Sequence, residues 1–152
     1  MRVFWHPVPI AAMIIVALND HLLKGSGLLP GWVTGKLSDV AGMIFFPLFA
    51  LALAEALVSA LAPVVSKLGL ASSMRFRVTR GRLLASCAIT GLFFAALKLS
   101  PLAAEIYLSW YRAVGLRAAV TPDLTDLVAL LCLPIAYLVG SRRIAEAPLK
   151  IQ

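Results

Sequence analysis

The residues of this chain that could bind an ion or carry charge lie at the ends of apolar segments. Ser38 precedes Asp39, and Thr125 precedes Asp126. An amide, a third acid and a lysine also stand at the ends of apolar segments: Asn19, Asp20 and Lys98. Polar and charged groups inside a membrane are costly unless they pair with one another or line a watery cavity. The set therefore suits either interhelical ion pairs or a binding site for an ion or a small substrate.

A repeated motif contains the first two of these aspartates. Residues 33–39 read VTGKLSD and residues 120–126 read VTPDLTD, at a constant offset of 87 residues. Each motif leads through an apolar run to a proline, Pro47 or Pro134. Because scarce residue types keep one register, we predict an internal duplication.

The composition is that of an integral membrane protein. Of 152 residues, 61% are hydrophobic and 14% are charged, and the mean hydropathy is +0.94. Backbone exposed to lipid must satisfy its own hydrogen bonds, and the period-2 alternation of a membrane barrel is absent, so the spans should be helices. Cys87 and Cys132 show no CxxC or Cys/His spacing, so we expect no disulfide, no metal site and no cofactor.

Four transmembrane helices are predicted, at about residues 4–23, 35–62, 83–99 and 122–139. The first, third and fourth are close to the ~20 residues that a bilayer requires, and the second is longer. Thr34 and Thr121 are expected to cap the second and fourth helices, and Pro47 and Pro134 are expected to kink them. Residues 101–114 should form a short interfacial helix before the fourth span, because apolar and polar side chains alternate there with helical period.

The spans fall into two helical hairpins, residues 1–66 and 83–152, arranged as a parallel repeat and joined by a basic loop at 67–82. The side with both termini and this loop carries nine Lys and Arg residues, against five on the other side. The positive-inside rule therefore puts both termini in the cytoplasm. Four arginines of the loop should contact anionic lipid headgroups rather than nucleic acid: Arg75, Arg77, Arg80 and Arg82.

Asp39 and Asp126 admit three interpretations. A carboxylate near a helix N-terminus is stabilised by the helix dipole, so both could be structural, as parts of capped helix starts and ion pairs. If the hairpins pack about a pseudo-two-fold axis, the aspartates instead face each other with Lys98 and Asn19 as neutralising partners, and form an ion, transport or ligand site. Catalysis is the third and least supported interpretation. Asp20 and His21 lack a second histidine on the same side, so no metal site is predicted.

The segments Leu18-Asn19-Asp20-His21 and VTGKLSDVAG at residues 33–42 resemble a group of small, uncharacterised bacterial integral membrane proteins with four spans. The resemblance covers about the first third of the chain. It implies a location in the bacterial cytoplasmic (inner) membrane and carries no activity.

The first functional hypothesis is a small transport, channel-like or ion-binding membrane protein that works through the outer-leaflet Asp/Lys cluster. Four spans enclose little volume, so a pore would need several copies, and we expect a homo-oligomer or a larger membrane complex. The alternative is a non-enzymatic accessory or assembly subunit. An intramembrane enzyme is the least supported hypothesis. The expected partners are membrane lipids, and nucleic acid is not among them.

Overall fold

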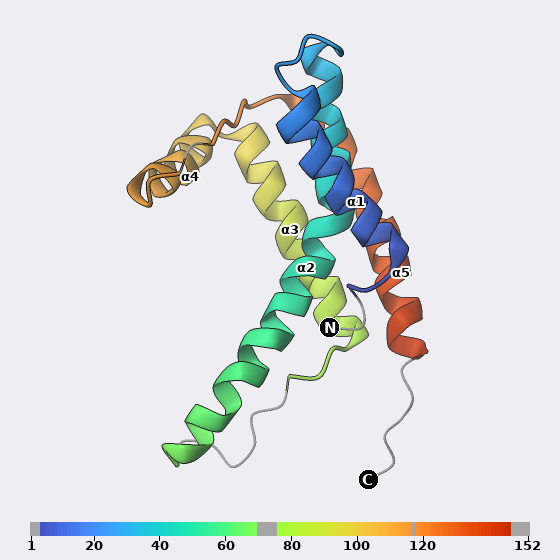
Figure 1. The fold of residues 1–152 in the computed structure, drawn as a ribbon, viewed down its shortest axis with the longest axis vertical. Coiled ribbons are helices and arrows are strands. Elements are labelled where there is room, and N and C mark those ends of the chain that lie inside the picture. The colour runs from blue at the N-terminus through green and yellow to red at the C-terminus, as the bar shows by residue number, and fades with distance from the viewer. Residues whose placement is uncertain (1–3, 70–75, 117, 147–152) are drawn as a thin grey trace.

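The computed structural model describes residues 4–69, 76–116 and 118–146, and all regular elements in these ranges are helical. In chain order they are α1 (Pro7–Leu18), the π-helix η1 (Asn19–Leu23), α2 (Gly31–Lys67), α3 (Arg80–Leu99), α4 (Pro101–Ala113), the 3-10 helix η2 (Leu124–Cys132) and α5 (Leu133–Ala145). Figure 1 shows α1, α2, α3 and α5 running roughly along one axis, with α4 turned aside near one end. The all-helical prediction is therefore confirmed.

Three helical segments of the described chain are long and apolar enough to cross a membrane: Gly31–Lys67, Arg80–Leu99 and Leu124–Ala145. Their surfaces expose large apolar side chains such as Leu92 and Leu131, which are 72% and 74% accessible. Soluble proteins rarely leave so much contiguous apolar surface uncovered, so the molecule has the exterior of a membrane protein. The first apolar segment, Pro7–Leu23, is shorter than these three.

Helix α2 starts earlier than predicted, and Thr34 does not cap it. Pro30 occupies the N-cap position, and its carbonyl oxygen accepts hydrogen bonds from the amides of Val33 and Thr34. The N-cap φ of −56° is the value to which the proline ring is fixed, and Gly31 and Trp32 follow it as helical residues. Thr34 is buried inside the helix, where its hydroxyl donates to the Gly31 carbonyl at 3.0 Å.

The fourth predicted span also begins differently. Asp123, not Thr121, is the N-cap of η2: its Oδ1 accepts from the amide and the hydroxyl of Thr125, each at 2.8 Å. Aspartate is a stronger N-cap than threonine, which accounts for the shift. Pro134 lies in the first turn of α5, where proline is tolerated, and it marks the change from 3-10 to α-helix instead of kinking one helix.

Pro47 does lie inside α2, as predicted, and is buried. The ribbon of α2 changes direction along its length (Figure 1), and an internal proline is the usual cause of such a bend. The Ser86 hydroxyl of α3 donates to the Pro47 carbonyl at 2.7 Å, which ties the two helices together beside the bend.

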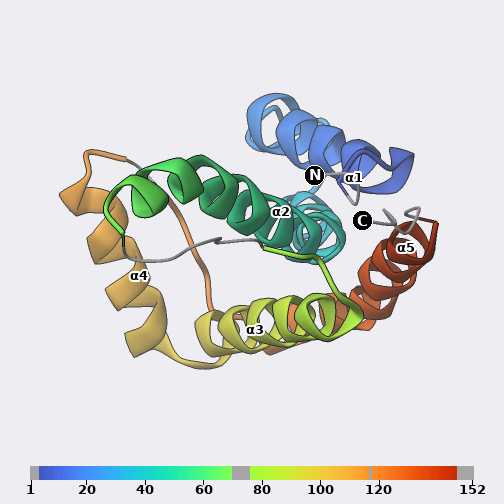
Figure 2. The ribbon, with the colours of Figure 1, turned by 90° about the horizontal axis from the view of Figure 1, so that it is seen from below.

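The core is small and lies where α2, α3 and α5 meet. One cluster consists of Leu48, Leu51, Leu83, Cys87 and Ala136, and a second, nearer the η2 end, consists of Met43, Phe94 and Ala129. Figure 2 shows α1 and α3 on opposite sides of α2. Glycine allows the closest approaches: a Cβ on Gly140 would come within 2.7 Å of Leu83 and 2.9 Å of Leu48.

Of the four predicted headgroup-binding arginines, Arg75 falls outside the described residues. Arg77, Arg80 and Arg82 are exposed at the start of α3. The Arg82 guanidinium lies 4.4 Å from the centre of the Phe76 ring and donates to the Arg77 carbonyl at 2.8 Å. The basic group thus lies at the end of α3 away from Lys98.

The glycine contacts give a direct test of the packing. Gly140→Ala should destabilise the protein by about 1–3 kcal/mol, because the added methyl overlaps two buried leucines. Gly81→Ala is the matched control: this helical glycine has no atom within 4 Å of its Cβ position, and the change should be neutral or stabilise by up to about 1 kcal/mol. Unfolding in detergent, followed by circular dichroism, measures both. Equal effects of the two changes would contradict this packing of α5.

Candidate functional site

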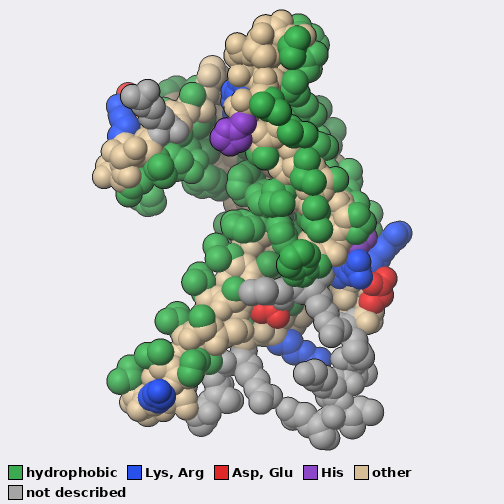
Figure 3. All heavy atoms as spheres, viewed as in Figure 1, with side chains coloured by type: hydrophobic (Ala, Val, Ile, Leu, Met, Phe, Trp, Pro, Cys, Tyr) green, Lys and Arg blue, Asp and Glu red, His purple; other side chains and the backbone are tan. Residues whose placement is uncertain are grey.

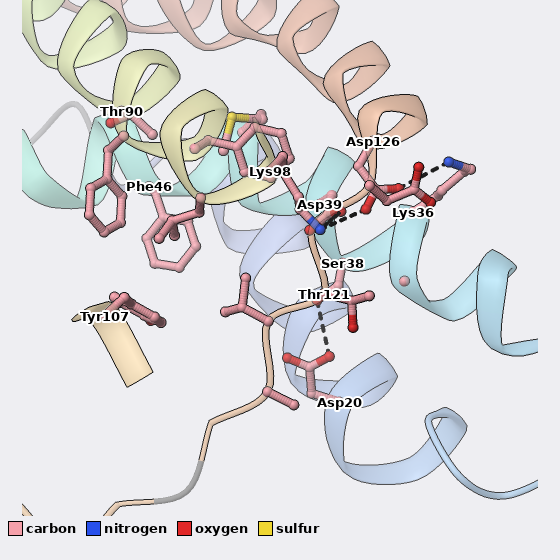
Figure 4. A pocket seen from close by; sticks show the side chains of 18 of the residues that line it. Asp20, Lys36, Ser38, Asp39, Phe46, Thr90, Lys98, Tyr107, Thr121 and Asp126 are labelled. Atoms are coloured by element: carbon pink, nitrogen blue, oxygen red, sulfur yellow. Dashed lines mark hydrogen bonds and ion pairs between the residues drawn. The ribbon is translucent and has the colours of Figure 1, made fainter. Parts of the chain in front are cut away.

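Lys98 gathers the two motif aspartates. It stands in the last turn of α3, and its Nζ lies 2.6 Å from Asp126 Oδ2 of η2 and 2.9 Å from Asp39 Oδ2 of α2 (Figure 4). The three side chains are only 12%, 11% and 19% exposed. Charges this far from water must be compensated by partners, and here one ammonium compensates carboxylates from two distant parts of the chain.

A second lysine completes the cluster. Lys36 Nζ donates to Asp126 Oδ1 at 3.0 Å and to Thr125 Oγ1 at 2.7 Å. Lys36, Asp39, Lys98 and Asp126, which we call the ionic cluster, carry two positive and two negative formal charges. Lys36 occupies the place in the first motif that Asp123 occupies in the second. Lys36 was not predicted as a site residue from the sequence. Its position one helical turn before Asp39, on the same helix face, was the pattern that could have indicated it.

Asp20 and Ser38 lie beside the ionic cluster. The Ser38 hydroxyl donates to Asp20 Oδ1 at 3.0 Å, and Lys24 pairs with the same oxygen at 3.9 Å. Asp20 stands in η1, where Lys24 N donates to the Asn19 carbonyl at 2.8 Å across one π-turn. Single π-turns of this kind occur frequently at functional sites.

Asn19 has a different role from the one predicted. It is fully buried, and its Nδ2 donates to the Thr34 carbonyl at 2.7 Å and to Asp20 Oδ1 at 3.2 Å. It therefore fastens the end of α1 to the start of α2 and orients Asp20, and it does not neutralise Asp39 or Asp126. The predicted partnership with Lys98 is confirmed, and that with Asn19 is wrong.

The ionic cluster leaves hydrogen-bonding capacity unused. Asp39 Oδ2 is buried, and no described residue donates a hydrogen bond to it; Lys98 meets it as an ion pair only. A buried acceptor without a donor carries a desolvation cost, so a ligand that donates a hydrogen bond to this atom would gain stability.

A cavity of about 830 Å³ opens beside the cluster. Its charged end is lined by Asp20, Lys24, Lys36, Ser38, Asp39, Lys98, Asp123 and Asp126, and its other walls are mostly apolar and aromatic, from α2, α3 and α4. In Figure 4 the ionic cluster lies at one end, and Phe46, Thr90 and Tyr107 lie at the other. Ser38, Asp39, Asp126, Lys98 and Asp20 were predicted together from their residue types; the cavity itself was not predicted.

Helix α4 supplies the outer wall of this cavity. Tyr107 packs edge-on against Phe93 of α3 with ring centres 5.8 Å apart, and the Tyr111 ring lies beside it at 4.7 Å, tilted by 45°. Burial, reinforced by the neighbouring Tyr111 hydroxyl, raises the pKa of the Tyr107 phenol well above its ordinary value, so this group remains a neutral donor. At the cavity mouth, the amide and hydroxyl of Thr125 hold the pKa of Asp123 below its ordinary value, so Asp123 stays charged.

No group of three or more His, Cys, Asp or Glu residues in the described ranges is arranged to hold a metal ion. No protein-family model, curated protein or solved structure matches this chain. The resemblance of residues 33–42 to small bacterial membrane proteins therefore stays a prediction.

The pairing predicts an asymmetric mutational pattern. Lys98→Met should destabilise the protein by about 3–5 kcal/mol, because Asp39 loses its cation while it remains buried. Asp39→Asn combined with Lys98→Met should recover most of that loss, since Asp126 keeps its ion pair with Lys36. Lys24→Met, which removes only a long and exposed pair, should cost less than about 1 kcal/mol. Denaturant unfolding in detergent measures all three. A Lys98→Met variant as stable as Lys24→Met would contradict the burial of the cluster.

Proposed function

We propose that this chain is a small transport or ion-binding protein of the bacterial cytoplasmic membrane that takes its substrate at the ionic cluster. The observation that carries the proposal is that a balanced, largely buried set of charges borders an 830 Å³ cavity instead of filling a closed core. Ionisable groups placed in this way within membrane segments usually mark a substrate or ion pathway.

The proposed topology has four spans as two parallel-repeat hairpins, with both termini cytoplasmic. Its support is that the start of α2, the end of α3 and the start of η2 meet at the ionic cluster, while the start of α1 and the end of α5 lie toward the opposite end (Figure 1). The helical run of α1 and η1 is then the first span. The excess of Lys and Arg at the other end supports a cytoplasmic location there, which puts the cavity mouth on the outer side.

The duplication is proposed on the same residues. Asp39 and Asp126, 87 positions apart, both reach Lys98, as two related hairpins facing each other would allow. The two copies differ locally, because Asp39 stands in an α-helix and Asp126 in a 3-10 helix. The extra helix α4 is specific to the second hairpin.

Binding is favoured over catalysis by the residues that line the cavity. Asp20, Asp39 and Asp126 are paired with its three lysines, Asp123 accepts from Thr125, and neither of the chain's histidines is among the lining residues. The cavity lies at the side of one chain, so passage across the membrane calls for movement of the helices or for association of several copies. We therefore propose a homo-oligomer for transport.

The second candidate is an accessory subunit of a larger membrane complex. The end of α2 beyond the core exposes a continuous apolar face, in which Leu53, Leu57, Leu61 and Val64 are 44–54% accessible. Figure 1 shows this part of α2 diverging from the other helices. A partner helix packed there would give the protein a structural role without any substrate.

Labelling of engineered cysteines in living cells tests the proposed site. In a background lacking Cys87 and Cys132, Ser38→Cys at the cavity mouth should react with an impermeant thiol reagent from outside. Ser66→Cys, exposed near the other end of the same helix, should react only after the cells are permeabilised.

Occupancy is then tested with small probes, namely Na⁺, K⁺ and glycerophosphoethanolamine. A probe at twice its dissociation constant should slow the labelling of Ser38→Cys about threefold by mass action, and leave Ser66→Cys unaffected. Reversed labelling of the two positions would refute the orientation. No protection by any of the three probes would refute binding of a small soluble substrate at the ionic cluster and favour the accessory subunit.

A further inference from the structure

We infer that the cavity holds a zwitterionic phospholipid taken from the outer leaflet, with its headgroup at the ionic cluster and one acyl chain along the aromatic wall. This inference rests on the proposed function, because it names the substrate class of that same site. Three observations support it: the shape of the cavity, its division into a charged and an apolar end, and the exposed side chains of Lys24 and Asp123 at the charged end.

The apolar end has the length of an acyl chain. Along α2 the lining runs from Asp39 to Leu53, and along α3 it runs back from Lys98 to Ile89. Fourteen helical residues rise about 21 Å, whereas one leaflet of the hydrocarbon core is about 15 Å deep. A chain whose headgroup lies at the cluster can therefore stay within the groove through its whole leaflet.

The volume and the opening of the cavity also suit a lipid. Its 830 Å³ lies within the range of about 300–1,000 Å³ of sites that enclose a ligand of drug size. Figure 3 shows the molecule hollowed between α4 and the diverging part of α2, with hydrophobic side chains on both sides of the hollow. In the proposed orientation this side faces lipid, so a lipid can enter laterally without leaving the membrane.

The charges select a headgroup that carries an ammonium. Four acids and three lysines line the charged end. Lys36 and Lys98 are already held by carboxylates, whereas the Asp39 Oδ2 atom receives no hydrogen bond from a described residue and Asp123 is exposed at the mouth. An ammonium near Asp39 and Asp123 adds a hydrogen-bond donor beside the Lys98 ion pair and offsets the one acid by which the charged end exceeds its lysines.

The anionic part of the headgroup has a separate place. Lys24 is 51% exposed and is held only by a 3.9 Å pair with Asp20, so it can turn to a phosphate at little cost. A phosphate at Lys24 and an ammonium at the acids match both ends of a zwitterion. An anionic lipid without an amine would bring a negative charge close to the acids. It would also provide no ammonium from which the carboxylate oxygens could accept hydrogen bonds.

Native mass spectrometry of the delipidated full chain in detergent tests this inference, with a phosphatidylethanolamine and a phosphatidylglycerol of equal chain length as probes. Phosphatidylethanolamine should be retained at least about tenfold better, which is the effect of a single well-placed charged contact. Equal retention of the two lipids, or a preference for phosphatidylglycerol, would overturn the inference.

A matched pair of variants locates the acyl chain. Ala50→Trp puts an indole into the cavity wall on α2, and because loss of as few as two buried methylene groups weakens binding about tenfold, retention should fall by at least that factor. Ala88→Trp, on an exposed position of α3 that does not line the cavity, should leave retention unchanged. Equal retention by both variants would overturn the inference.

These outcomes separate the inference from the proposed function. Protection of Ser38→Cys by glycerophosphoethanolamine or a cation, together with no lipid preference and no effect of Ala50→Trp, leaves a site for a small soluble substrate and refutes the lipid. Failure of every small probe and of both lipids refutes the site itself.

Discussion

The Lys98 ammonium holds two carboxylates that are 87 residues apart in the chain, and the arrangement of the helices depends on this contact. Neither Asp39 nor Asp126 can lie in a low-dielectric setting without a cation. Because α2, α3 and η2 each contribute one member, their ends are fixed against one another at one end of the bundle. The Ser86 hydroxyl bond to Pro47 and the close packing at Gly140 then fix the same helices further along.

The cavity forms because α2 and α4 turn away from the contacts that hold the bundle together. Helix α2 contains Pro47 and changes direction, and α4 leaves the axis of the bundle directly after α3 (Figure 2). The space bounded by α2, α3 and α4 is therefore charged at the Lys98 end and apolar elsewhere. A protein that only needed the ion pairs for stability could bury them in a closed core, so the open cavity beside them is what favours a binding function over a purely structural one.

The sequence predicted the parts of this arrangement that depend on residue type. The cost of a charge among apolar residues predicted that Asp39, Asp126 and Lys98 would pair, and the helical period of apolar side chains over residues 101–114 predicted helix α4 closely. Local competition decided what was not predicted: Pro30 and Asp123 begin their helices in place of Thr34 and Thr121, and a π-turn carries Asp20. The role of Lys36 and the cavity depend on how distant segments meet, which no local pattern in the chain records.

The most direct measurement of the central claim is solid-state NMR of the protein in lipid bilayers, with ¹⁵N in lysine side chains and ¹³C in aspartate side chains. The contacts predict that the Lys98 ammonium nitrogen couples to the carboxyl carbons of both Asp39 and Asp126 and exchanges slowly with water, because the three side chains are at most 19% exposed. A Lys98 nitrogen that couples to neither carboxyl carbon, or to one alone while its protons exchange freely with water, would contradict the account.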